Sequence, residues 1–270
     1  MSGRLVVCAT PIGNLEDVTL RLLETLRTAD VVACEDTRHT AGLLKRHGIT
    51  AKLVSYHEHN EAHRAPELVA RIAAGEIVAL VTDAGMPLVS DPGHVLVGAV
   101  VAAGGRVEVL PGPSAAVTAL VASALPADTW RFVGFLPRKA GELRALLAGA
   151  RETLVAFESP HRTAASLAAL AELDPERPVA VCRELTKLHE EIARGSAAAL
   201  AARYAEAEPR GEVVLVVGAP PPAAADLGAA LDAVERLVAA GAKARPAAQV
   251  VAELTGAPAN ALYRGLLERK

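Results

Sequence analysis

Three short loops rich in glycine and proline, each directly behind an apolar run of strand length, constrain the fold of this chain more than any other feature. The loops are residues 9–14, 82–93 and 111–115. In an open α/β sheet, ligands bind beyond the carboxyl ends of the strands. Glycine lets the backbone approach a ligand closely, and proline holds it there. Any one of these loops could be an ordinary β-to-α turn, but three in one half of the chain predict the wall of a single cleft.

Apolar runs of strand length alternate with helix-like stretches along the whole chain. This pattern predicts an α/β fold whose mostly parallel sheets are covered by helices. The predicted strands of the first half are residues 4–9, 30–34, 53–56, 77–82 and 106–110. Those of the second half are residues 132–136, 153–158, 178–183, 190–194 and 212–217. Between the strands, residues 20–26 and 62–72 show the apolar spacing of helices.

The two sets of strands predict two α/β domains, residues 1–122 and 123–219. Three consecutive prolines among alanines give residues 219–225 the composition of a stiff linker. Residues 226–270 follow as a helical tail, with predicted helices at residues 227–240, 247–254 and 259–267. Because the charges of the tail are nearly balanced, packing or a dimer contact is as good an interpretation as contact with nucleic acid.

Composition excludes several classes of protein. Aromatic residues make up only 3% of the 270 residues, so the cores are built from Ala, Val and Leu, and stacking platforms for single-stranded nucleic acid are scarce. The net charge of −3 argues against a protein that coats nucleic acid by bulk electrostatics. Cys8, Cys34 and Cys182 lie in apolar runs as small buried hydrophobes, which predicts a reducing, cytoplasmic compartment. No apolar window reaches the roughly 18 residues of a membrane span, so no contact with a membrane is expected.

Four polar clusters lie next to predicted strand ends, at residues 34–40, 57–63, 158–162 and 183–191. Each could be a solvated loop with a helix cap, but four at strand ends indicate chemistry. The second cluster contains three histidines, yet their spacing fits no common metal site and the cysteines lie elsewhere, so no metal is expected. The chain also lacks the P-loop motif and the dinucleotide-binding glycine fingerprint, so a nucleoside triphosphate, NAD or FAD is not expected.

Seven short motifs follow one another along residues 5–218. They are Pro11-Ile12-Gly13-Asn14-Leu15, Glu35-Asp36-Thr37-Arg38, His57 with Asn60-Glu61, Asp83-Ala84-Gly85 with Ser90-Asp91-Pro92-Gly93, Pro111-Gly112-Pro113-Ser114-Ala115, Ser159-Pro160-His161-Arg162 and Arg183-Glu184-Leu185-Thr186-Lys187. Together these motifs resemble the ribosomal RNA small subunit methyltransferase I family, which belongs to the tetrapyrrole methylase superfamily. The helical tail is also similar to that family.

The resemblance implies two α/β domains with S-adenosyl-L-methionine in the cleft between them, and a homodimer. It also implies 2′-O-methylation of a cytidine ribose in the decoding region of 16S ribosomal RNA within the small ribosomal subunit. Carried over position by position, the cofactor-binding residues would be Thr10, Pro11, Gly13, Asp83, Gly85, Met86, Pro87, Val89, Ser90, Ser114, Ala115 and Val214. Superfamily members that act on small molecules tend to carry Gly-Asp-Pro where this chain has Gly85-Met86-Pro87, and this difference fits the ribosomal branch.

Methyl transfer to a hydroxyl group needs the reactants held in attack geometry and a base that receives the hydroxyl proton. The candidate bases are His57, Asp36, Glu61 and Glu184, with Lys187 or Arg38 placed to bind phosphate or to stabilise negative charge. The candidate RNA-binding residues are Arg38, Asn60, His161, Arg162 and Arg183. A carboxylate base would need a raised pKa, whereas a histidine works near its ordinary pKa.

Two other functions stay open on the sequence alone. The first is methylation of a tetrapyrrole or another small molecule, although residues 35–38, 57–61 and 159–162 match the ribosomal branch. The second is a non-enzymatic ribosome-binding protein on a methylase scaffold, which a binding titration with S-adenosylmethionine would distinguish. For an RNA enzyme with a net charge of −3, we expect docking on a folded subunit by shape, with few phosphate contacts.

Overall fold

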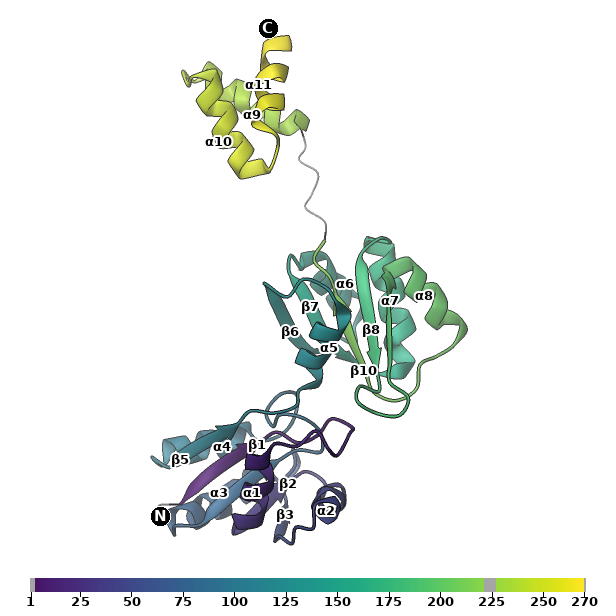
Figure 1. Ribbon diagram of the computed structural model, residues 1–270. Helices are drawn as coiled ribbons and strands as arrows, with labels where there is room; N and C mark the ends of the chain where they lie inside the picture. Colours follow the sequence, from purple (N-terminus) through teal and green to yellow (C-terminus); the bar gives the residue numbers. More distant parts are fainter. Residues whose placement is uncertain (1–2, 221–226, 270) are drawn as a thin grey trace. The chain divides into compact units, whose positions relative to one another are not determined.

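A computed structural model of the chain describes residues 3–220 and 227–269. The chain divides into two compact units, a larger one of Met1–Ala219 and a smaller one of Pro220–Lys270 (Figure 1). Most of the predicted linker, residues 221–225, lies outside the described residues. The predicted division of the larger unit into two domains at residue 122 stays a prediction.

The first sheet of the larger unit consists of five parallel strands. They are β1 (Arg4–Cys8), β2 (Val31–Cys34), β3 (Leu53–Ser55), β4 (Ile77–Val81) and β5 (Arg106–Leu110), in the order β3-β2-β4-β1-β5. The central strands are apolar runs buried on both faces, as parallel strands between two helical layers must be. Because all five strands run in one direction, the loops that follow them meet at one edge of the sheet.

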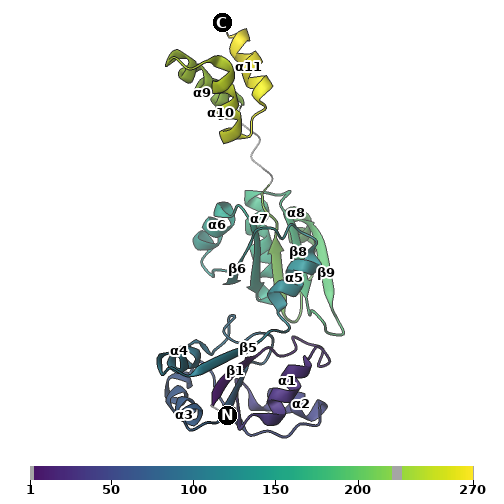
Figure 2. The ribbon, with the colours of Figure 1, turned by 60° about the vertical axis from the view of Figure 1, so that its left-hand side comes forward.

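Four helices cover the two faces of this sheet (Figure 2). They are α1 (Leu20–Thr28), α2 (Thr37–Arg46), α3 (Glu61–Ala73) and α4 (His94–Ala102). On one face, Leu5 and Val7 pack with Leu68 of α3 and Leu96 of α4. On the other face, the alternating strand residues pack with α1 and α2. This alternation follows from the two-residue period of a strand.

The second sheet of the larger unit has mixed strand directions. Its strands are β6 (Trp130–Phe135), β7 (Thr153–Glu158), β8 (Pro178–Arg183), β9 (Glu191–Ser196) and β10 (Val213–Val217), in the order β6-β7-β10-β8-β9. Only β6 and β7 pair in parallel, while β10 runs antiparallel to both its neighbours and β8 to β9. The seven residues 184–190 between β8 and β9 are too few for the crossover that parallel pairing needs. The α/β fold class is confirmed, and parallel pairing is complete only in the first sheet.

Helices also cover both faces of the second sheet. The helices α6 (Ala140–Gly149), α7 (Pro160–Leu173) and α8 (Ala197–Glu206) pack on one face. On the other face lies α5 (Ala115–Ser123), whose Ala119 and Leu120 share a core with Val155 and Cys182. The helix α5 therefore follows the last strand of the first sheet but packs against the second sheet.

The smaller unit is a bundle of three helices with a core of its own. They are α9 (Leu227–Ala239), α10 (Ala244–Thr255) and α11 (Ala259–Glu268), which bury Val234, Val251 and Leu262. Helix α10 begins three residues before its predicted start, because Pro246 lies in the first turn, where a missing N–H costs no hydrogen bond. Gly256 ends that helix with a φ of 73°, in the left-handed region that glycine adopts readily.

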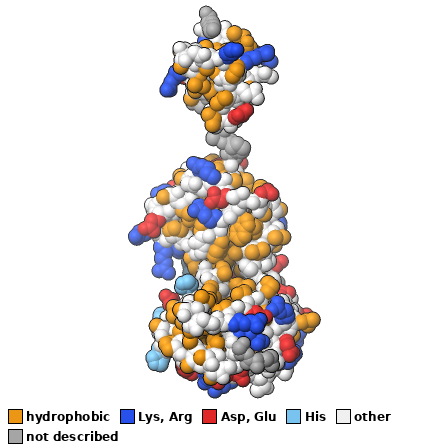
Figure 3. Space-filling view, turned by 90° about the vertical axis from the view of Figure 1, so that its left-hand side faces the viewer, with side chains coloured by type: hydrophobic (Ala, Val, Ile, Leu, Met, Phe, Trp, Pro, Cys, Tyr) orange, Lys and Arg blue, Asp and Glu red, His pale blue; other side chains and the backbone are white. Residues whose placement is uncertain are grey.

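The surface of the larger unit mixes apolar and charged side chains. On the face that Figure 3 shows, hydrophobic side chains lie among Lys, Arg, Asp and Glu side chains. Large apolar residues with exposed side chains include Val109, Val121 and Phe135. No helix within residues 3–220 or 227–269 is both long enough and apolar enough to cross a membrane.

Candidate functional site

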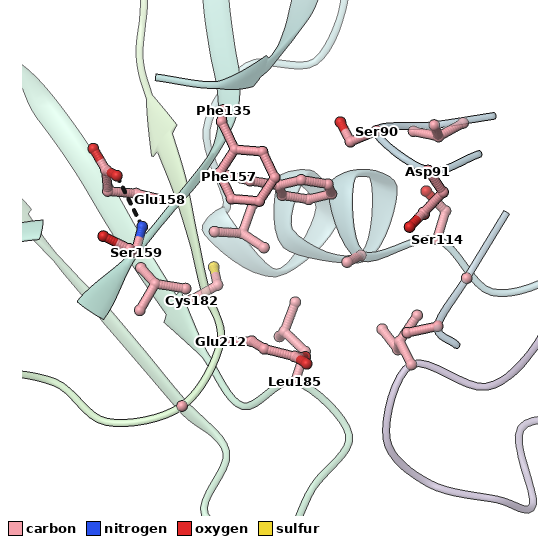
Figure 4. Close-up of a pocket in the computed structure, with 18 of the residues that line it drawn as sticks. Ser90, Asp91, Ser114, Phe135, Phe157, Glu158, Ser159, Cys182, Leu185 and Glu212 are labelled. Atoms are coloured by element: carbon pink, nitrogen blue, oxygen red, sulfur yellow. Dashed lines mark hydrogen bonds between the residues drawn. The ribbon is translucent and has the colours of Figure 1, made fainter. Parts of the chain in front are cut away.

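A cavity of about 400 Å³ opens in the larger unit between the carboxyl edge of the first sheet and the second sheet. Its volume is within the range of small-molecule sites. All three glycine- and proline-rich loops contribute to its lining, through Ile12, through residues 84–86 and 89–91, and through Ser114 and Ala115. Figure 4 shows Ser90, Asp91 and Ser114 on one side of the cavity and Glu158 and Ser159 on the other.

The first and second of these loops are tied together behind the cavity. The backbone N–H of Thr10 donates to the Gly85 carbonyl at 2.9 Å, and the N–H of Gly85 donates back to the Thr10 carbonyl at 3.1 Å. The Thr10 hydroxyl donates to the Thr82 carbonyl at 3.0 Å. Thr10 is only 3% exposed, so its side chain holds the loops in place and does not line the cavity.

The loop after β4 is one of two described segments with strained backbone at two non-glycine residues, the other being the segment after β8. Gly85 has a φ of 78°, and the non-glycine residues Leu88 and Ser90 have φ values of 73° and 66°. Residues other than glycine rarely adopt such angles and do so where the surrounding structure imposes them, often at functional sites. The strained loop brings Ser90 and Asp91 to the cavity wall.

An aromatic cluster forms part of the opposite wall. The rings of Phe135 and Phe157 meet edge to face, with centroids 5.6 Å apart, and Phe132 packs on Phe157 at 5.0 Å. The chain contains only three phenylalanines, and all three lie in this cluster. The scarcity of aromatic residues was the available sequence signal for this cluster. Their common location was not predicted. Phe135 and Phe157 give the cavity an apolar face.

Glu158 is a buried carboxylate at the cavity. Its side chain has no exposed surface and accepts hydrogen bonds from the Ser159 N–H at 2.8 Å and the Ser166 hydroxyl at 2.6 Å. Arg162 forms an ion pair with it at 3.2 Å and also donates to the carbonyls of Leu136 and Pro137. The guanidinium of Arg162, a predicted RNA contact, is thus bonded inside the unit, and its role toward RNA stays a prediction.

Asp91 has the most unusual carboxyl group at the cavity. Burial raises its pKa to about 7, and the nearby charges of Glu35 and Asp83 add to this shift. Burial and the charge of Asp83 also raise the pKa of Glu35. Asp91 belongs to the motif Ser90-Asp91-Pro92-Gly93, but no role was predicted for it from the sequence. A carboxyl group that titrates near neutrality can accept and hold a proton under physiological conditions.

Two of the candidate bases form a local network after β3. The Asn60 side-chain oxygen accepts from the His57 N–H at 2.9 Å, and its amide nitrogen lies 3.2 Å from His57 Nε2. His57 Nδ1 is buried without a hydrogen-bond partner among the described residues. Glu61 accepts from the Tyr56 hydroxyl at 3.2 Å.

The other two candidate bases are held in their ionised forms by cations. Asp36 accepts from the Arg38 backbone N–H at 2.8 Å and pairs with its side chain at 2.7 Å, which lowers the pKa of Asp36 well below its usual range. Lys187 lies 2.9 Å from Glu184 and lowers the pKa of Glu184. Both carboxylates are therefore weak proton acceptors.

Some of the predicted site residues line the cavity and others do not. Those that line it are Gly85, Met86, Val89, Ser90, Ser114, Ala115 and Val214. Those predicted for the cofactor that do not line it are Thr10, Pro11, Gly13, Asp83 and Pro87. Within the described part of the chain, none of the predicted catalytic or RNA-binding residues lines it. The predicted roles of all these residues stay predictions.

Several lining residues had no role in the sequence analysis. Besides Asp91, they include Phe135, Phe157, Glu158, Ser159, Cys182 and Glu212. Cys182 is free and buried, like Cys8 and Cys34, so the expectation of small buried cysteines is confirmed. Burial raises the pKa of the Cys182 thiol to about 11, so this side chain is a neutral part of the wall.

Comparison with known proteins identifies the family. The family model described as Tetrapyrrole (Corrin/Porphyrin) Methylases matches residues 4–201. A Ribosomal RNA small subunit methyltransferase I of Mesorhizobium japonicum is 51% identical over 98% of this chain and 92% of its own length. Its counterpart of Escherichia coli O157:H7 is 44% identical over 99% of this chain and 96% of its own length.

Solved structures share the fold. The uroporphyrin-III C-methyl transferase from Thermus thermophilus, complexed with S-adenyl homocysteine, has a TM-score of 0.57 and 23% identity to this chain, covering 80% of this chain and 97% of its own. Sequence and fold therefore agree, and the chain belongs to the ribosomal RNA small subunit methyltransferase I family of the tetrapyrrole methylases.

Proposed function

We propose that this protein transfers the methyl group of S-adenosyl-L-methionine to the 2′-hydroxyl of a cytidine ribose in the decoding region of 16S ribosomal RNA. The observation that carries the proposal is the identity of 51% and 44%, over nearly the whole chain, to relatives named Ribosomal RNA small subunit methyltransferase I. The ribose, the cytidine and the decoding region rest on the seven motifs that resemble this family. The substrate is the RNA within the small ribosomal subunit.

The cavity fits the proposed methyl donor in size and chemistry. Its volume of about 400 Å³ and its apolar phenylalanine face suit a nucleoside that carries a tail linked through a sulfonium. Backbone groups of residues 84–86 and the N-terminus of α5 at Ser114 would supply polar contacts. When bound, S-adenosylmethionine supplies an electrophilic methyl group on a positively charged sulfur. The protein's own residues must orient the ribose hydroxyl and receive its proton.

Asp91 is the proposed proton acceptor. It lines the cavity. Because its pKa is about 7, a large share of the group is carboxylate at neutral pH, and this carboxylate is a stronger base than one with an ordinary pKa. Asp36 and Glu184 are poor alternatives because neighbouring cations lower their pKa values. His57 stays the second candidate, since its buried Nδ1 has no partner within the described chain.

A transfer assay tests the proposed function against its two alternatives. The purified protein would be incubated with radiolabelled S-adenosylmethionine and either undermethylated small ribosomal subunits or a panel of tetrapyrroles. We expect label in the ribosomal RNA alone. Label in a tetrapyrrole alone would establish the small-molecule alternative. Cofactor binding at micromolar concentration without transfer to either acceptor would contradict the proposal, and failure to bind the cofactor at millimolar concentration would support the scaffold alternative.

We also propose that the protein acts as a homodimer, as the family resemblance implies. Exposed apolar side chains such as Val109 and Val121 support this proposal, because a second copy could bury them. Sedimentation equilibrium is expected to give twice the chain mass of 27.9 kDa. A single-chain mass at micromolar concentration would contradict it.

A further inference from the structure

A second, smaller pocket lies at the end of the second sheet, next to the C-terminal part of α8. Its volume is about 270 Å³. The residues that line it are Arg183, Glu191, Arg203, Tyr204, Ala207, Glu208, Pro209 and Arg210. Three of these eight residues are arginines, in a chain whose net charge is −3.

The second pocket and the cavity are neighbours, because residues at the end of β8 and just before β10 line both of them. Cys182 of β8 lines the cavity, and the next residue, Arg183, lines the second pocket. Successive side chains of a strand point to opposite faces, so the two sites lie on opposite faces of the same sheet end. The segment before β10 is shared in the same way, since Arg210 lines the second pocket and Gly211 lines the cavity.

The charges of this pocket do not balance. Glu191 accepts from Arg183 at 3.1 Å and is also ion-paired with Arg203. The other acid, Glu208, is paired with His161. The side chain of Arg210 forms no hydrogen bond or ion pair with any residue in the described ranges, although its carbonyl accepts from Arg183 at 3.2 Å. Three guanidinium groups therefore face two carboxylates, and guanidinium donors remain available.

A buried hydroxyl group in the same pocket lacks a partner. Tyr204 is 4% exposed, and its hydroxyl forms no hydrogen bond within the described residues. Burial raises the pKa of Tyr204, so the group stays protonated and available as a donor. Buried hydroxyls are almost always bonded, and an anion in this pocket would supply the missing acceptor.

We propose that this pocket binds a backbone phosphate of the RNA, close to the nucleotide whose ribose hydroxyl reaches the cofactor at the mouth of the cavity, through donors of Arg203, Arg210 and Tyr204. Guanidinium groups match the geometry of phosphate oxygens and bind them in a bidentate fashion. The ion pair with Glu191 keeps Arg183 and Arg203 in place on the pocket wall. This proposal rests on the proposed function, because it takes RNA as the substrate. A free phosphate ion has the same chemistry, and the test separates the two.

The test measures binding of a fluorescein-labelled single-stranded 12-nucleotide RNA over a series of salt concentrations. The variant Arg210→Gln removes one charge from the pocket. The matched control is Arg106→Gln, which removes one exposed charge at the amino end of β5, the opposite edge of the first sheet from the cavity. We expect the salt slope of log affinity to fall by about 0.7 for Arg210→Gln, as for the loss of one phosphate contact on a single strand. The control should keep the wild-type slope, and equal slopes for the two variants would overturn the proposal.

The variant Tyr204→Phe distinguishes an effect of the hydroxyl on RNA affinity from an effect on protein stability. Removing an unpartnered buried hydroxyl should leave the thermal unfolding midpoint unchanged or raise it. If the hydroxyl donates to a bound phosphate, the same variant should weaken RNA binding about threefold, roughly the loss of a modest hydrogen bond. A lower unfolding midpoint with unchanged RNA affinity would contradict this role of Tyr204. A titration with S-adenosylmethionine, expected to match the wild type, checks that the cavity is intact.

Calorimetry with inorganic phosphate at constant ionic strength distinguishes the source of the anion. Phosphate binding to the wild type, combined with RNA binding by Arg210→Gln equal to that of the control, would assign the pocket to a free ion and overturn the RNA part of the proposal. Failure of the wild type to methylate ribosomal RNA would count against the proposed function but would leave the binding assay decisive for the pocket. Normal methylation by the wild type with equal salt slopes for both variants would refute the pocket alone.

Discussion

Asp91 shows how one residue is given unusual chemistry by its surroundings. Its carboxyl group is partly buried near Glu35 and Asp83, so its pKa rises to about 7. In the unfolded chain the same group titrates near 4. Between about pH 4 and pH 7 Asp91 therefore holds a proton in the folded state that it has lost in the unfolded state. The free energy of unfolding falls as the pH rises through this window.

The variant Asp91→Asn should separate these effects. Above pH 7 we expect a higher unfolding midpoint than that of the wild type, because no charge is buried, and the difference should vanish toward pH 4. If Asp91 accepts the hydroxyl proton, methyl transfer should slow by about 10²- to 10⁴-fold and lose its rise between pH 6 and pH 8. Single-turnover rates against pH measure this, with the exposed Asp17→Asn as the control. A wild-type rate and pH profile for Asp91→Asn would exclude this role.

Gly13 is required by the space around it. A Cβ at this position would lie 2.5 Å from Lys187 Cγ, 2.7 Å from Thr186 Oγ1 and 2.9 Å from the Leu185 carbonyl oxygen. The Asn14 N–H donates to the Thr186 hydroxyl at 3.0 Å, so the first loop touches the segment after β8 directly. These contacts require a glycine for the close approach of two protein segments, and the predicted contact of Gly13 with the cofactor stays a prediction.

The variant Gly13→Ala is expected to destabilise the larger unit by about 1–3 kcal/mol, as overpacking does. The control, Gly42→Ala, lies within α2 with nothing within 4 Å of the new Cβ, and should stabilise by up to about 1 kcal/mol. Denaturant unfolding of both variants checks the opposite signs. A neutral Gly13→Ala would show that the two segments separate readily.

At the scale of elements, Glu158 links β7 to α7. Its buried carboxylate is satisfied by Ser159, Ser166 and Arg162, and Arg162 in turn bonds the carbonyls after β6. The sequence contains the Glu158–Arg162 spacing, but only the packed structure shows that these side chains bond each other. A short polar motif looks the same in a sequence whether its charges face RNA or the core.

Arg162→Met should leave the Glu158 carboxylate unpaired and cost about 3 kcal/mol of stability, whereas Arg162→Lys, which keeps the charge, should cost less. Chemical denaturation measures both. If Arg162→Met is as stable as the wild type, the ion pair with Glu158 does not stabilise the fold. The RNA-binding role predicted for Arg162 from the sequence would then be favoured.

The strands were predicted to within about two residues, because most of them, such as β2, β4 and β10, are short apolar runs bounded by glycine, proline or charged residues. The pairing of the second sheet was not predictable in the same way. The strand β10 lies between β7 and β8, and nothing local in residues 213–217 encodes that neighbourhood. The same reason explains why Phe135 and Phe157 were missed at the cavity, since they come together only through the sheet.

At the scale of the whole molecule, the chain contains two units with separate cores. The smaller unit buries its own apolar residues around Val234 and Leu262. The cavity is built from residues of the larger unit, between Ile12 and Val214. Folding of the larger unit and cofactor binding therefore should not depend on the tail.

Deletion of residues 220–270 should leave the affinity for S-adenosylmethionine within about twofold of the full chain and the unfolding midpoint of the larger unit unchanged. Isothermal titration and thermal unfolding of the truncated protein measure this. Equal losses of cofactor affinity and subunit methylation would contradict independence and give the tail a structural role. Loss of subunit methylation alone would indicate that the tail contacts the subunit.

Methylation of a cytidine ribose is tested most directly by identifying the product nucleoside. After reaction with undermethylated small subunits, the ribosomal RNA would be digested to nucleosides and the methylated product identified by mass spectrometry, with alkaline cleavage locating the modified linkage. We predict 2′-O-methylcytidine at a single alkali-resistant linkage in the decoding region. A methyl group on a base, on another nucleoside or at an alkali-sensitive position would contradict the claim.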